Sequence, residues 1–74
     1  MLDRVLAILT AAGLSASRTF GAADLYAEGT EERVCVYRCP GKGTDAQLKA
    51  ALEALRAAGL RANPGRDRVV IRPA

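Results

Sequence analysis

Two cysteines and one glycine-rich segment are the parts of this 74-residue chain whose residue types and spacing could support chemistry. Cys35 falls in the predicted β-strand at 33–38 and Cys39 directly follows it. Four residues of extended chain span about 13 Å, whereas a disulfide needs Cα atoms about 5.5 Å apart. Because the chain has no histidine, two cysteines cannot complete a four-ligand zinc site within one copy. We therefore expect reduced, half-buried cysteines, no metal and no cofactor, unless two copies share a four-cysteine site.

The segment CPGKGTD at residues 39–45 has the components of a phosphate-binding loop, because it joins a predicted strand to the start of a predicted helix. Its order differs from the GxxxxGK[ST] pattern of nucleotide-binding loops, since Lys42 precedes Gly43. The simpler interpretation is a connection in which Thr44 caps the helix. Weak binding of phosphate or of a nucleic-acid backbone is the alternative.

Few residues in the chain could perform acid–base or nucleophilic catalysis. The absence of histidine removes the most common general base and the serine and cysteine triads. The carboxylates lie in hydrophilic stretches, and none stands alone within an apolar run, where catalytic acids are often found. We therefore expect no catalytic residues, no enzymatic activity and no small-molecule substrate.

The hydrophobic periodicity identifies two helices that would position these groups. Apolar residues recur at helical spacing over residues 2–12 and over residues 45–58. The sequence TDAQ, which starts at Thr44, has the spacing of a capping box before the second helix. Gly13 and Gly59 are the expected ends of the two helices, because glycine adopts the left-handed conformation without strain.

Four strands are predicted from composition and alternation. RVCVYR at 33–38 and RVVIR at 68–72 are rich in β-branched and aromatic residues. AADLYAE at 22–28 alternates like a third strand, with a short helix as the alternative. A fourth strand begins at Leu60, and Asn63-Pro64-Gly65 is the predicted turn that folds it back onto residues 68–72.

The second half of the chain repeats the pattern of the first half. Residues 1–16 and 47–62 share eight identities, including Ala-Ala-Gly-Leu at the end of each helix. Residues 33–36 align with 68–71 at an offset of 35 instead of 46, so the first unit has 11 additional residues. Duplication and convergence of two similar helices both explain the pattern. Either origin predicts one domain over residues 1–74 with an α+β fold: a two-layer αββαββ arrangement, in which a four-stranded, mainly antiparallel sheet carries two helices on one face.

The face of this sheet opposite the helices is predicted to be apolar enough to need a cover. We therefore expect a small protein-interaction module, such as an adaptor, an inhibitor or a subunit of a larger complex. Its partner would be another protein or a second copy in a homodimer, and tyrosine is a residue type enriched at such interfaces. The alternative cover is the segment 15–31 of the same chain. The predicted interface residues are Tyr26, Cys35, Tyr37 and Val70.

The net charge of +3 is concentrated in the second half of the chain, which makes nucleic acid the alternative partner. Residues 1–39 hold four basic and five acidic side chains, and residues 40–74 hold seven and three. Nine of the eleven basic residues are arginine, which also fits the codon usage of a GC-rich bacterial or phage genome. The basic half has no aromatic residue on which a base could stack. The candidate phosphate contacts are Lys42, Lys49, Arg56, Arg61, Arg66, Arg68 and Arg72.

The distribution of apolar residues along the chain favours a cytoplasmic location. The first residues lack the continuous apolar block of a signal peptide. No stretch approaches the run of about 18 apolar residues that a membrane span needs. We therefore expect no membrane partner.

Overall fold

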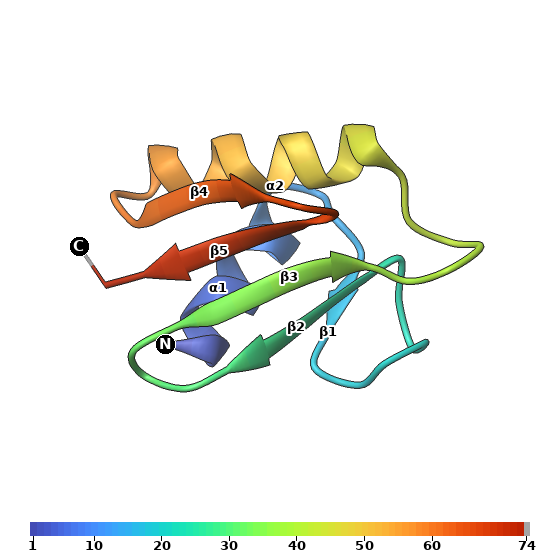
Figure 1. Cartoon of the computed structure of the whole chain (residues 1–74), viewed down its shortest axis with the longest axis horizontal. Helices are drawn as coiled ribbons and strands as arrows, with labels where there is room; N and C mark the ends of the chain where they lie inside the picture. Colours follow the sequence, from blue (N-terminus) through green and yellow to red (C-terminus); the bar gives the residue numbers. More distant parts are fainter. Residues whose placement is uncertain (74) are drawn as a thin grey trace.

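Two helices pack on one face of a five-stranded sheet in the computed structural model, which describes residues 1–73. The elements in chain order are α1 (Leu2–Ala11), β1 (Ala16–Ser17), β2 (Leu25–Gly29), β3 (Val34–Arg38), α2 (Asp45–Ala57), β4 (Arg61–Gly65) and β5 (Arg68–Arg72). The strand order is β1-β2-β3-β5-β4, in which β1 is parallel to β2 and the other neighbours are antiparallel. Figure 1 shows the strands passing in front of both helices, so one face of the sheet has no helix over it.

The start of α2 has the capping box that the sequence predicts. Thr44 Oγ1 accepts a hydrogen bond from the Gln47 amide at 3.1 Å, and the Thr44 amide donates to Gln47 Oε1 at 2.8 Å. These bonds satisfy amides that have no partner within the helix. Gln47 Nε2 also donates to Asp24 Oδ2 at 2.8 Å, which ties the start of α2 to the segment before β2.

Both helices end in the same way. Gly13 follows α1 with a φ of 82°, and Gly59 follows α2 with a φ of 88°, as the sequence predicts for these glycines. The amide of the next residue then returns to a carbonyl of the last turn, from Leu14 to Leu9 at 3.0 Å and from Leu60 to Leu55 at 3.1 Å. The positive φ and this bond are the features by which glycine commonly terminates a helix.

The two hairpins that follow the helices share one register. In β2–β3, Ala27 lies opposite Val36, and in β4–β5, 35 residues later on each strand, Ala62 lies opposite Ile71. The pairing of β3 with β5 then joins the two αββ units edge to edge in one sheet. The 11 additional residues of the first unit therefore lie between α1 and β2, where they include β1.

The core lies between the helices and the sheet, and both helices and the four longer strands contribute to it. No polar or charged residue among residues 1–73 is buried. No helix in this part of the chain is long and apolar enough to cross a bilayer. The buried core residues are Val5, Leu9, Leu25, Ala27, Val34, Val36, Leu48, Ala51, Leu55, Leu60, Ala62, Val69 and Ile71.

The sheet has five strands and one parallel pairing, whereas the sequence predicts four mainly antiparallel strands. The additional strand is β1, in which Ala16 and Ser17 pair in parallel with Leu25 and Tyr26. A strand of two residues is too short to show a period of alternation, so the sequence contains no signal for it. Residues 25–29 form β2, not the short helix considered as the alternative.

The second hairpin turns at Arg66 and Asp67, so the prediction of a turn at Asn63-Pro64-Gly65 is wrong. These three residues belong to β4, an edge strand, where proline is tolerated because its missing N–H need not join the ladder. Asp67 has the positive φ of the turn, at 57°. Its carboxylate also accepts a hydrogen bond from Arg38 at 3.0 Å.

Alanine in place of either helix-ending glycine should destabilise the protein by a similar amount, about 1 kcal/mol, because a left-handed backbone is costly for residues with a Cβ. No atom lies within 4 Å of the added Cβ at Gly13 or Gly59, so the cost is conformational at both sites. Urea unfolding of Gly13→Ala and Gly59→Ala measures it. Lys49→Ala, an exposed change on α2, is the control and should stay within about 0.5 kcal/mol of the parent. Losses no larger than that of the control would contradict this account of the helix ends.

Candidate functional site

The sheet face that points away from the helices carries the side chains that alternate with the core positions. Tyr26 lies opposite Tyr37, and Tyr37 lies opposite Arg68 on the neighbouring strand. Two residues away on the same face, Cys35 lies opposite Glu28 on one neighbouring strand and opposite Val70 on the other. We call this surface the open face, and its residues are Tyr26, Glu28, Cys35, Tyr37, Arg61, Asn63, Arg68, Val70 and Arg72.

Three aromatic rings and one guanidinium group form a row across the strands. The ring of Phe20 meets the ring of Tyr26 edge to face, with centroids 5.5 Å apart. The rings of Tyr26 and Tyr37 are inclined by 26°, and their centroids are 6.0 Å apart. Arg68 Cζ lies 5.1 Å from the centroid of Tyr37, a favourable contact because the cation faces an electron-rich ring. We call Phe20, Tyr26 and Tyr37 the aromatic row, and Arg68 lies at its end.

Phe20 extends the aromatic row beyond the edge of β2. The residue is 62% exposed, and it is the one large exposed hydrophobic residue in the described part of the chain. It belongs to the connection that follows β1, and Lys42 Nζ holds this connection by donating to the Gly21 carbonyl at 2.6 Å. Phe20 is thus a surface ring on a segment that is fixed to the loop before α2.

The two tyrosines of the row are held in the neutral state. The Tyr26 hydroxyl donates to Glu28 Oε2 at 2.6 Å, and this bond, followed by burial, raises the pKa of Tyr26 above its usual value of 10.0. Burial and then the neighbouring Cys35 thiol raise the pKa of Tyr37. Both phenols are uncharged at physiological pH, as an unperturbed tyrosine also is, and the raised pKa values extend the neutral state to higher pH.

The predicted phosphate contacts divide into two groups. Arg61, Arg68 and Arg72 lie on the open face, and none of them forms an ion pair with an acid among residues 1–73. Arg68 Nε donates to the Arg66 carbonyl at 3.2 Å, which leaves the other nitrogens of its guanidinium group for a ligand. Arg56 is used internally, because its Nε donates to the Ala62 carbonyl at 2.8 Å. The predicted contacts that lie away from the open face are Lys42 before α2, Lys49 and Arg56 on α2, and Arg66 in the β4–β5 turn.

The shared register of the two hairpins places arginines where the first hairpin has tyrosines. At the offset of 35 residues, Tyr26 corresponds to Arg61, and Tyr37 corresponds to Arg72. The β2–β3 half of the open face therefore presents rings, and the β4–β5 half presents cations. The two halves meet where Arg68 packs on Tyr37.

The four residues predicted as an interface do share the open face, but they differ in exposure. Tyr26, Tyr37 and Val70 are half-buried, whereas Cys35 is only 5% exposed. Cys35 and Cys39 are free thiols, and both are buried, so the prediction that they are half-buried is wrong.

Sequence reasoning did not include Phe20 in this surface, and it placed Arg68 only among the phosphate contacts. Phe20 lies in a segment without periodicity, and its contact with Tyr26 is made by tertiary packing. Arg68 reaches Tyr37 because β5 pairs with β3. The sequence signals for the surface were the alternations along 22–28, 33–38 and 68–72.

The glycine-rich loop before α2 is a packed connection. Gly43 lies so close to the segment before β2 that an added Cβ would be 2.5 Å from the Asp24 carbonyl oxygen. Thr44 serves as the cap of α2, and the Lys42 ammonium is bound by the Gly21 carbonyl. These groups are therefore occupied by contacts within the chain.

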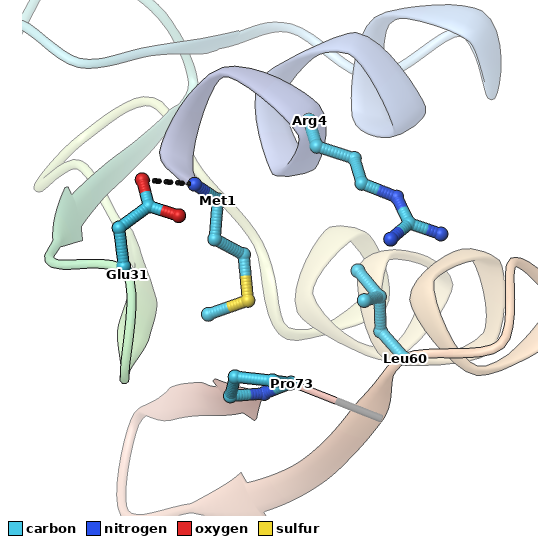
Figure 2. Close-up of a pocket in the computed structure, with 5 residues that line it drawn as sticks. All are labelled: Met1, Arg4, Glu31, Leu60 and Pro73. Carbon is cyan, nitrogen blue, oxygen red and sulfur yellow. Dashed lines mark hydrogen bonds and ion pairs between the residues drawn. The ribbon is translucent and has the colours of Figure 1, made fainter.

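A cavity of about 330 Å³ lies between the start of α1, the β2–β3 turn and the end of β5 (Figure 2). Glu31 Oε1 accepts a hydrogen bond from the N-terminal ammonium at 2.6 Å, and Arg4 donates to the Ala58 carbonyl at 3.5 Å. Because both charged side chains of the cavity are engaged in this way, the open face is the stronger candidate site. The lining residues are Met1, Arg4, Glu31, Leu60 and Pro73.

Neither a metal cluster among residues 1–73 nor similarity to a known protein accounts for the open face. Among residues 1–73, no group of three cysteine, aspartate or glutamate side chains is placed to hold a metal ion. No protein-family model matches the chain, and no curated protein or solved structure is significantly similar to it.

The tyrosine environments predict an alkaline titration that depends on the fold. Because the chain has two tyrosines and no tryptophan, tyrosinate absorbance reports on Tyr26 and Tyr37 alone. The fold favours the neutral phenols, so this stabilisation is complete below the unfolded pKa of 10.0 and is lost as the pH rises through the higher folded pKa. The absorbance midpoint should lie higher in buffer than in concentrated urea, and Glu28→Gln should lower the Tyr26 component. Identical midpoints in buffer and urea would contradict the described packing.

Proposed function

We propose that this domain is a non-enzymatic binding module for single-stranded nucleic acid, which lies across the open face of the sheet. The observation that supports the proposal is the aromatic row ending at Arg68, on a sheet face without a helix over it. Exposed aromatic rings on a sheet are a common platform for unpaired bases. The proposal therefore assigns the bases to the aromatic row.

Base stacking accounts for the aromatic half of the face. Each base that stacks on an aromatic side chain contributes about 1–3 kcal/mol, with little dependence on sequence. Phe20 offers the most exposed ring. Tyr26 and Tyr37 are half-buried and neutral, and they pack against each other with Phe20 and Arg68 as outer neighbours, so the proposal has bases reach these two rings from the solvent side of the row. In a duplex the base faces are covered by their neighbours, so the row should favour single strands.

Phosphate binding accounts for the cationic half of the face. Arg61, Arg68 and Arg72 are exposed there, and the open face has one carboxylate, that of Glu28. The basic half of the sequence lacks aromatic residues, which argued against single-strand binding at the level of sequence. The β3–β5 pairing removes that objection, because it brings Tyr37 from the first half beside Arg68 from the second.

A protein partner or a second copy is the other candidate for the same face. It is favoured by the half-buried Tyr26, Tyr37 and Val70 around Cys35, since tyrosine and arginine are enriched at the centres of protein interfaces. Such a partner would have to supply acidic groups for the arginines. Two copies of this face would bring two sets of arginines together, each with one Glu28, so nucleic acid is the better electrostatic match.

Fluorescence anisotropy with labelled single-stranded RNA, single-stranded DNA and a duplex of the same sequence tests the proposal over a range of salt concentrations. Tyr37→Ala should weaken single-strand binding about tenfold through lost stacking, without changing the salt dependence. Arg61→Ala with Arg72→Ala should reduce the slope of log affinity against log salt by about 1.4, because each phosphate contact on a single strand contributes about 0.7.

Lys49→Ala with Arg66→Ala is the matched control for the double arginine variant, because it removes two positive charges from α2 and the β4–β5 turn and leaves the open face intact. Circular dichroism confirms that each variant is folded. Saturable single-strand binding that is tighter than duplex binding and sensitive to Tyr37→Ala would support the proposal. The absence of single-strand binding at low salt, together with a dimer in light scattering, would overturn it in favour of protein docking.

A further inference from the structure

We infer that Glu28 selects the base that stacks beside it, and that the selected base is guanine. This inference rests on the proposed single-strand binding and concerns the same face. Its basis is the position of one carboxylate at the hydroxyl end of an aromatic ring, on a surface that otherwise carries arginines.

A hydrogen bond between Tyr26 and Glu28 places a carboxylate beside the hydroxyl end of the Tyr26 ring. Glu28 is exposed on the open face, two residues after Tyr26 on β2. Its Oε2 accepts the Tyr26 hydroxyl at 2.6 Å. Within residues 1–73 that is the hydrogen bond its side chain makes, so Oε1 is available to a ligand. In the proposed complex, a base that packs on the solvent side of the Tyr26 ring would have one edge near the phenol oxygen and therefore beside the carboxylate.

Hydrogen-bond chemistry determines which base that edge belongs to. An ionised carboxylate only accepts hydrogen bonds and can accept two side by side. The Watson–Crick edge of guanine has adjacent N1–H and N2–H donors. One of them would bind Oε1, and the other would bind the second lone pair of Oε2, whose first lone pair accepts the Tyr26 hydroxyl. Adenine and cytosine place one amino group beside an acceptor nitrogen, and uracil and thymine place one N–H between two carbonyl oxygens. The carboxylate repels those acceptors. It should therefore increase the affinity for guanine the most and decrease the affinity for uracil or thymine the most.

The negative charge of Glu28 repels the phosphates of a nucleic acid. Hydrogen bonds donated by a base to the carboxylate would offset this repulsion. A carboxylate on a surface that binds a polyanion lowers the affinity by like-charge repulsion. Glu28 also orients the Tyr26 ring by accepting its hydroxyl. This second role needs only one acceptor oxygen. Glutamine keeps that oxygen and replaces the other with a donor, so Glu28→Gln separates base selection from ring orientation.

The test uses a short labelled uridine oligonucleotide and three versions in which the central base is guanine, adenine or cytosine. The parent protein should bind the guanine version about tenfold more tightly than the all-uridine version, since a bidentate base contact discriminates by about 1–3 kcal/mol. Glu28→Gln should abolish this preference and leave the all-uridine affinity equal or higher, because it removes the repulsion. Tyrosinate titration of the variant reports separately on the environment of Tyr26.

Glu32→Gln is the matched control, because it removes the same charge from an exposed position in the β2–β3 turn, and it should retain the guanine preference. Equal binding of all four oligonucleotides, with Tyr37→Ala still weakening them, would overturn the role of Glu28 and leave the proposed function standing. A guanine preference that survives Glu28→Gln would also overturn it. Failure of every oligonucleotide to bind would overturn both proposals.

Discussion

β3 and β5 pair in antiparallel fashion from Val34 and Ile71 to Tyr37 and Arg68, and through this pairing the two αββ units share one sheet. On the helix side of the pairing, Val36 lies opposite Val69, and both are buried under the helices. On the other side, the same pairing brings a tyrosine next to an arginine. The core and the candidate binding face are therefore two sides of one set of strand contacts, and a shift of one residue in register would exchange them.

The distribution of ion pairs decides where the positive charge of the molecule is available. Arg38 bonds Asp45 at the start of α2 at 2.8 Å and Asp67 in the β4–β5 turn at 3.0 Å, and Arg18 pairs with Asp3. Exposed pairs such as these add little to stability. They nevertheless engage acids away from the open face, so the arginines of β4 and β5 keep their full charge toward solvent. A modest net charge of +3 thus becomes a local cationic surface.

The sequence was sufficient for the elements whose signals are local, and insufficient for the contacts that depend on packing. Both helices, their ends at Gly13 and Gly59 and the alternation of β3 were predictable, because each depends on neighbouring residues. β1 was not, since two residues carry no period, and the Asn-Pro-Gly signal failed because Pro64 is accommodated by an edge strand. The candidate site was half predictable: alternation placed Tyr37 opposite the helices, but only the sheet order shows that Arg68 and Phe20 join it.

The β3–β5 pairing, which we call the seam between the two αββ units, affects the rate of folding. Each hairpin closes over a short turn, whereas the seam joins residues more than thirty positions apart, and the entropy of loop closure increases with that separation. We expect the αββ units to form early and the seam to form in the rate-limiting step, as contacts distant in sequence slow folding. Core changes at the seam should then slow folding, whereas changes around Phe20 should act mainly on the rate of unfolding. The segment that carries the most exposed ring can therefore vary in evolution without delaying the assembly of the domain.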